Sequence, residues 1–194
     1  RPRDWSSDVC SSDLVGDIDN DGDQDLFFTN VGHSIPLFLT SGDLRKDQRH
    51  THDWMLLRND GNFHFTDVTG EYGLTGEGFA WGAVFEDFNL DGYLDLFVAQ
   101  NYIKWPVHKW LKLSGRTYLQ TGEPPARTFL QAPTLGLENK HFGQSPVIVD
   151  LDGDGRQDLV WLNIDGPAAG GARSETAAGH RCGHSSARVV CSLT

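Results

Sequence analysis

The sequence predicts an all-β fold: a partial β-propeller of about two complete blades and part of a third. Three observations predict it. One motif recurs at blade-sized intervals, short apolar runs are bounded by Gly, Asp and Asn, and no long amphipathic helical pattern occurs. The repeats occupy residues 15–167 of the 194-residue chain.

The repeated motif reads DxDxDGxxDL followed by an apolar run, and its three copies align without gaps. The first aspartates of the copies are Asp17, Asp87 and Asp150, which lie 70 and 63 residues apart. This interval is typical of propeller blades and longer than the repeat of helical solenoids. The copies are VGDIDNDGDQDLFFTN (15–30), FEDFNLDGYLDLFVAQN (85–101) and IVDLDGDGRQDLVWLN (148–163).

A second element precedes two of the loops, at residues 56–65 and 116–129. Both segments read as strand, turn and strand, and Asp60-Gly61 is a strong hairpin signal in the first. A Gly-Leu pair follows each hairpin, and 13 residues separate that Leu from the next loop aspartate in both copies. We therefore expect short strands throughout the repeats.

The three loops, at 17–25, 87–95 and 150–158, predict calcium sites. Carboxylates at loop positions 1, 3 and 5 point toward one centre, Gly at position 6 permits the turn, and Asp at position 9 closes the shell. Oxygen ligands suit Ca²⁺ better than zinc or copper. The predicted side-chain ligands are Asp17, Asp19, Asp21 and Asp25; Asp87, Asn89, Asp91 and Asp95; and Asp150, Asp152, Asp154 and Asp158. The position-7 carbonyls of Asp23, Tyr93 and Arg156 are expected to complete the three sites.

The charge balance also favours a cation as partner. The three loops hold 12 of the 27 acidic residues, and the formal net charge is −11. Carboxylates this close repel one another unless a cation lies among them. A nucleic-acid partner is not expected, because phosphate binding requires a basic surface.

Two other calcium loops do not fit. An EF-hand needs a bidentate Glu at position 12 between two helices, but position 12 is Phe28, Val98 or Trp161 and a strand is expected to follow. Dockerin loops begin similarly, but their two copies lie closer together and lead into helices.

The sequence does not predict an enzyme. It contains no nucleophile motif and no Gly-rich phosphate loop, and the spacing of its paired carboxylates assigns them to metal. The alternative is that the repeats form the propeller portion of a secreted carbohydrate-active enzyme, such as a polysaccharide lyase or hydrolase.

Two less regular regions, 33–53 and 102–114, are expected to be insertions between strands. The second contains the aromatic residues Tyr102, Trp105 and Trp110. Such side chains can stack on a sugar or anchor a protein partner, so we regard them as candidate ligand-binding residues. Burial against neighbouring blades is the alternative.

Both ends differ in character from the repeats. The string DWSSDVCSSDL at 4–14 matches the translation of a common sequencing adapter, so residues 1–14 are expected to be an artefact. Residues 168–194 lack Asp, Phe and Trp and show no strand or helix period, which indicates an unstructured or frameshifted tail. All three cysteines lie at these ends, which leaves the redox compartment open.

The loop motif resembles the FG-GAP/VCBS repeat of integrin-like β-propellers. The fuller pattern, LLRNDGNFHFTDVTGEYGL followed by GFAWGAVFEDFNLDGYLDLFVAQN, is similar to a subgroup related to cartilage acidic protein and the bacterial ASPIC/UnbV proteins. The resemblance implies a propeller of about seven blades, of which this chain is a fragment. It also implies calcium in the blade loops, an extracellular, cell-surface or periplasmic location, and surface loops that bind a protein or glycan. No membrane span is expected, and the strand before the first loop is expected to be missing at the adapter-like string.

Overall fold

The computed structural model contains only strands, turns and bends in the part of the chain that it describes, which confirms the all-β prediction. No described helix is long and apolar enough to cross a membrane. The described residues are 10–30, 53–75, 79–100, 102–104, 109–111, 115–124, 126–132, 143–151, 153, 157–163, 169–172 and 188–189.

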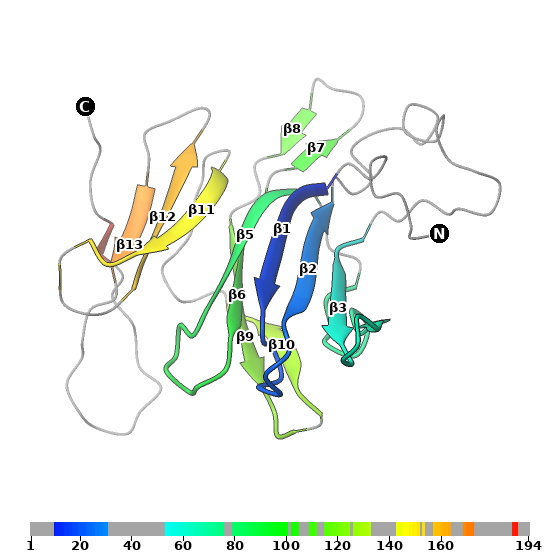
Figure 1. Cartoon of the computed structure of the whole chain (residues 1–194). Coiled ribbons are helices and arrows are strands. Elements are labelled where there is room, and N and C mark those ends of the chain that lie inside the picture. The colour runs from blue at the N-terminus through cyan, green and yellow to red at the C-terminus, as the bar shows by residue number, and fades with distance from the viewer. Residues whose placement is uncertain are drawn as a thin grey trace.

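Three four-stranded antiparallel sheets make up most of the described fold (Figure 1). Sheet 1 contains β1 (Cys10–Gly16), β2 (Asp25–Asn30), β3 (Met55–Asn59) and β4 (Phe65–Asp67). Sheet 2 contains β5 (Ala80–Glu86), β6 (Asp95–Gln100), β9 (Arg116–Thr121) and β10 (Thr128–Gln131). Sheet 3 contains β11 (Gly143–Val149), β12 (Asp158–Asn163), β13 (Ala169–Ala172) and β14 (Arg188–Val189). A separate ribbon pairs β7 (Tyr102–Lys104) with β8 (Lys109–Leu111).

The sheets are arranged as consecutive blades. Each is a meander in chain order, and the first strand of sheet 2, β5, contacts the first strands of both neighbours, β1 and β11 (Figure 1). First strands that lie side by side in this way are typical of the inner strands of a propeller. The structure is therefore a partial β-propeller, as the repeat interval predicts.

The predicted hairpins are present as β3–β4 and β9–β10, with Asn59 opposite Phe65 and Thr121 opposite Thr128. Each hairpin closes its own sheet, and the next sheet begins one strand before the following loop. The sequence repeat gives the length of a blade but does not show which strand comes first in it. Only the strand pairing shows where each blade starts.

Sheet 2 is packed on both faces. Every residue of β6 is buried, because Leu96 and Val98 face the core shared with sheet 1, and Phe97 and Ala99 face the core shared with sheet 3. Alternate residues of a strand point to opposite faces, so β6 serves two cores. In sheet 1, β2 instead alternates between buried and half-buried residues, since one of its faces has no described sheet against it.

Both chain ends contribute strands that the sequence does not predict. β1 begins at Cys10, within the adapter-like string, and supplies the strand that is expected to be missing: Leu14 pairs with Phe27 and packs against the first core. Likewise β13 and β14 lie in the predicted tail and extend sheet 3. Strand pairing joins backbone groups, which every residue except proline supplies in full, so composition is a weak guide to these edges.

The contact between sheets 2 and 3 requires glycine in β5. A Cβ on Gly82 would lie 2.6 Å from Pro146 Cδ and 3.1 Å from Ser145 N of β11. Gly82→Ala is therefore expected to lower the free energy of unfolding by about 1–3 kcal/mol through overpacking, measured by urea denaturation. Gly70→Ala is the control, because its added Cβ meets only Thr75 Cγ2 at 3.9 Å. Equal losses in the two variants would contradict this account.

Candidate calcium site

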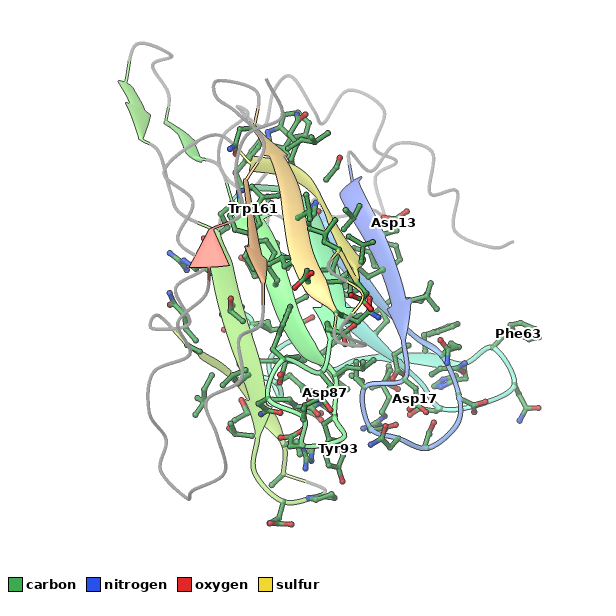
Figure 2. The ribbon with its side chains drawn as sticks, turned by 90° about the vertical axis from the view of Figure 1, so that its left-hand side faces the viewer. Asp13, Asp17, Phe63, Asp87, Tyr93 and Trp161 are labelled. Carbon is green, nitrogen blue, oxygen red and sulfur yellow. The ribbon has the colours of Figure 1, made fainter. Side chains whose placement is uncertain are left out.

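The motif loops join the first and second strands of their sheets. We call them loop 1 (17–25), loop 2 (87–95) and loop 3 (150–158). Asp17 and Asp87 lie on neighbouring loops at one end of the sheets (Figure 2). Because the blades repeat in parallel, their corresponding loops gather at the same edge.

The aspartate at position 1 caps the backbone of its own loop. Asp17 Oδ1 accepts a hydrogen bond from Asp21 N at 3.1 Å, and its Oδ2 accepts one from Gly22 N at 3.0 Å. Asp87 accepts the equivalent pair of bonds in loop 2, at 3.0 and 2.8 Å. The two loops therefore share one hydrogen-bonded frame.

Left-handed backbone at loop positions 4 and 6 turns the chain tightly. Position 4 has φ of 60° at both Asn20 and Leu90, and φ of 76° at Gly153 of loop 3. Position 6 has φ of 94° at Gly22 and 88° at Gly92, which explains the glycine of the motif. Leu90 is 70% exposed, so this strained position is not compensated by burial of its side chain.

The aspartate at position 9 anchors the loop to its sheet. Asp25 is fully buried, and its Oδ2 accepts from Ile18 N and its Oδ1 from Asn59 N, both at 2.8 Å. Asp95 accepts in the same way from Phe88 N at 2.9 Å and Gln120 N at 2.8 Å. The motif predicts a metal ligand here but does not reveal this anchoring role, which depends on a strand 25 or more residues away.

Loop 1 brings carboxylates together as a metal site requires. Asp17, Asp19 and Asp21 each offer an oxygen, and these oxygens lie within 4.8 Å of one another. Asp25 is not part of this group. Asp19 Oδ1 is buried and meets no hydrogen-bond donor in the described part of the chain. Burial, together with the neighbouring Asp21 and Asp17, raises the pKa of Asp19. All the ligand atoms in this group are oxygens, so it fits a divalent cation that prefers hard ligands.

At the predicted side-chain ligand positions, loop 2 has one carboxylate fewer than loop 1, because position 3 is Asn89. Asn89 Oδ1 accepts from Asp91 N at 3.0 Å, and Asn89 Nδ2 donates to Asp91 Oδ2 at 3.1 Å. The position-5 carboxylate also accepts from Tyr93 N at 2.9 Å, as Asp21 does from Asp23 N at 2.8 Å in loop 1. The amide is uncharged, so the side chains of loop 2 repel one another less than the carboxylates of loop 1 do.

Several of the predicted site residues are described only in part. In loop 3, Asp158 Oδ2 accepts from Leu151 N at 3.0 Å, which repeats the position-9 role. Asp150 Oδ1 accepts from Gly153 N, at position 4, at 2.7 Å, whereas the position-1 aspartates of loops 1 and 2 accept from positions 5 and 6. Predicted ligands Asp152, Asp154 and Arg156 lie outside the described residues, as does the aromatic residue Trp105. Tyr102 and Trp110 are placed on β7 and β8 by backbone alone.

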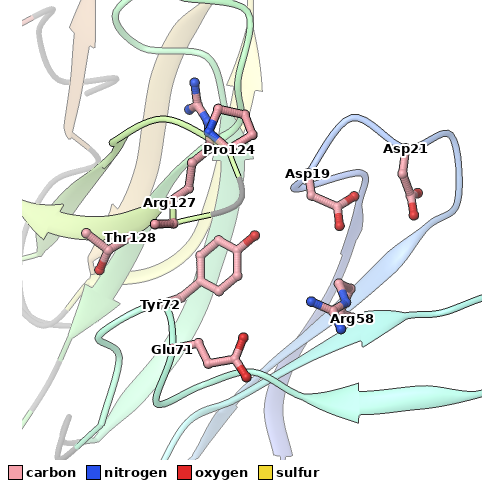
Figure 3. A pocket seen from close by; sticks show the side chains of 9 residues that line it. Asp19, Asp21, Arg58, Glu71, Tyr72, Pro124, Arg127 and Thr128 are labelled. Atoms are coloured by element: carbon pink, nitrogen blue, oxygen red, sulfur yellow. The ribbon is translucent and has the colours of Figure 1, made fainter.

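A cavity of about 560 Å³ lies beside loop 1 (Figure 3). It is bounded by Asp19 and Asp21, by Glu71 and Tyr72 of the β4–β5 connection, and by the β9–β10 turn with Arg127. Figure 3 shows the Tyr72 hydroxyl turned toward the side of the cavity on which Asp19 lies. The cavity combines acceptors, donors and an aromatic wall, which is typical of a site that recognises a polar ligand. Sequence reasoning did not find it, because its walls come from distant segments.

The sequence comparison bears on both complete loops. The family described as FG-GAP-like repeat matches residues 17–98, from the first aspartate of loop 1 to β6. This stretch is therefore similar to the FG-GAP-like repeat. The matched region includes loops 1 and 2 and the β3–β4 hairpin between them. No curated protein matches the chain.

Proposed function

We propose that this chain is a calcium-binding FG-GAP repeat module of an extracellular, cell-surface or periplasmic β-propeller protein, and that it binds a protein or glycan. The observation that carries the proposal is the group of Asp17, Asp19 and Asp21 oxygens. A calcium ion there would satisfy Asp19 Oδ1 and offset the repulsion within the group. Binding, and not catalysis, is the role we assign to the surface.

Two features support the narrower assignments. The β3–β4 hairpin and the following Gly73-Leu74 pair belong to the pattern that resembles the cartilage acidic protein and ASPIC/UnbV subgroup. The cavity beside loop 1 gives a ligand a concave polar surface adjacent to the metal. The alternative, the propeller portion of a secreted carbohydrate-active enzyme, would be revived by glycan turnover in a protein that contains this module.

Calcium is expected to raise the melting temperature of the chain. With an extracellular-type affinity near 10⁻⁴ M, each occupied site adds about 1 kcal/mol at about 1 mM calcium. The measurement is thermal unfolding in EDTA, in calcium and in magnesium, followed by circular dichroism. Magnesium is the control, because it demands a smaller octahedral shell and keeps its waters.

The same measurement on Asp19→Asn and on the exposed Asp53→Asn separates site binding from general charge effects. Asp19→Asn is expected to remove most of the loop 1 contribution, and Asp53→Asn to leave the calcium shift unchanged. An identical shift in magnesium and calcium, or none in either, would refute the proposed metal function.

A further inference from the structure

Gln120 of β9 connects sheet 2 to loop 1 of sheet 1. It is fully buried, and its Nε2 donates to Ile18 O at 2.7 Å across 102 positions of sequence. Its backbone N donates to Asp95 Oδ1 at 2.8 Å. One residue therefore contacts the frames of two motif loops, although it belongs to neither loop.

The orientation of the Gln120 amide is fixed by its other partner. Gln120 Oε1 accepts from Arg127 Nη1 at 3.3 Å, and the Arg127 guanidinium lies 3.0 Å from the centroid of the Tyr93 ring. Because Arg127 can only donate, the oxygen of the amide must face it. The nitrogen is then left to donate to Ile18 O.

We infer that Gln120 is a positioning residue of the loop 1 calcium site, which is thus assembled by two sheets; this inference depends on the proposed calcium function. Ile18 lies between two members of the carboxylate group, Asp17 and Asp19. Its N–H is held by Asp25 and its carbonyl by Gln120. That carbonyl belongs to the peptide unit that ends at Asp19 N, so Gln120 fixes the backbone from which the Asp19 carboxylate projects.

A second contact holds loop 1 against sheet 2. Asn20 Nδ2 donates to Gly92 O at 2.9 Å, which joins position 4 of loop 1 to position 6 of loop 2. Sheet 2 and its loop therefore hold loop 1 at two points: a buried one at Ile18 and an exposed one at Asn20. It follows that calcium at loop 1 stabilises the packing of sheet 1 on sheet 2, because the bound geometry requires both.

The residue of sheet 1 that is equivalent to Gln120 has a different side-chain partner. Asn59 occupies the equivalent position in sheet 1, since its N donates to Asp25 as Gln120 N donates to Asp95. Its shorter side chain donates instead to Gln24 O at 3.2 Å, within its own sheet. The longer side chain of Gln120 reaches the preceding sheet.

The test compares the two loops in one protein. In the full chain, Asp87→Asn with Asp150→Asn leaves loop 1 as the intact motif loop, and Asp17→Asn with Asp150→Asn leaves loop 2. Gln120→Met is then added to each background, since Met keeps the length of the side chain and lacks the donor. Calcium affinity is measured by isothermal titration calorimetry, and terbium luminescence sensitised by Tyr93 independently reports loop 2.

We expect Gln120→Met to weaken calcium binding at loop 1 by about three- to tenfold, the effect of one lost hydrogen bond. Loop 2 is expected to change by less than twofold. Unchanged affinity at loop 1, or equal weakening at both loops, would overturn the role of Gln120 while leaving the calcium function intact. Absence of calcium binding before Gln120 is changed would overturn both.

A second measurement needs no core substitution. In the Asp87→Asn, Asp150→Asn background, calcium titration followed by NMR should shift the side-chain amide signals of Gln120. The exposed Gln131 is the control and should not shift. A Gln120 signal that does not respond while loop 1 binds calcium would also overturn the inference.

Discussion

Replacing Trp54 with alanine is expected to lower the free energy of unfolding by about 3–5 kcal/mol. Trp54 is 1% exposed and precedes β3 in the core between sheets 1 and 2. Its ring makes edge contacts with Phe27 of its own sheet, at 5.8 Å between centroids, and with Tyr118 of sheet 2, at 5.9 Å. The variant removes a large buried surface and the aromatic contact that joins the two sheets.

The matched control is Trp81→Ala. Trp81 lies on β5 and contacts Phe79 at 4.9 Å, but it is 37% exposed and belongs to neither described core cluster. We expect its loss to cost less than half as much, measured by urea denaturation in calcium. Equal destabilisation would mean that the interface between sheets 1 and 2 is not the principal core.

Local features of this fold could be predicted from sequence because their causes are local. The apolar runs after each loop are strands, and Asp60-Gly61 opens a hairpin. Gly22 and Gly92 occupy the left-handed position that the motif reserves for glycine. The aspartates at loop positions 1 and 5 bond to their own loops, within five residues.

Other features depend on contacts between distant segments, and these carry no local signal. In the sequence, Gln120 is one polar residue among several in a strand. Only the packing of β9 beside loop 1 shows its contact with Ile18. The motif predicts that Asp25 is a metal ligand. It does not predict that Asp25 anchors the loop, because the partner Asn59 is 34 residues away. The strand at Cys10–Gly16 uses backbone pairing, which the composition of an adapter-like string does not prevent.

The anchoring aspartates give the apo protein an expected pH dependence. Burial raises the pKa of Asp95 to about 6 and also raises the pKa of Asp25, although backbone N–H groups lower both in part. A carboxyl whose pKa is higher in the folded state binds protons more tightly there. Its stabilising contribution is complete below the unfolded pKa of about 4 and is lost as the pH rises through about 6.

In EDTA, the free energy of unfolding is therefore expected to fall between about pH 4 and pH 7. The loss from Asp95 is about 3 kcal/mol, since its pKa rises by about two units from 3.8. Asp60 opposes this trend only at the acidic end of the range, where its unfolded carboxyl is still partly protonated, because bonds from the Thr66 hydroxyl and Arg58 lower its pKa in the folded state. Urea denaturation at several pH values in EDTA measures the slope.

Calcium should flatten or reverse this slope, because a cation near loop 2 favours the ionised Asp95 and protons compete with it. Asp95→Asn is the control: whatever it does to absolute stability, it removes the titrating group and should flatten the slope in EDTA. A steep fall that persists in Asp95→Asn would assign the pH dependence to other carboxyls. A slope that calcium leaves unchanged would show that the metal and the buried anchor are not linked, and that loop 2 is held by hydrogen bonds alone.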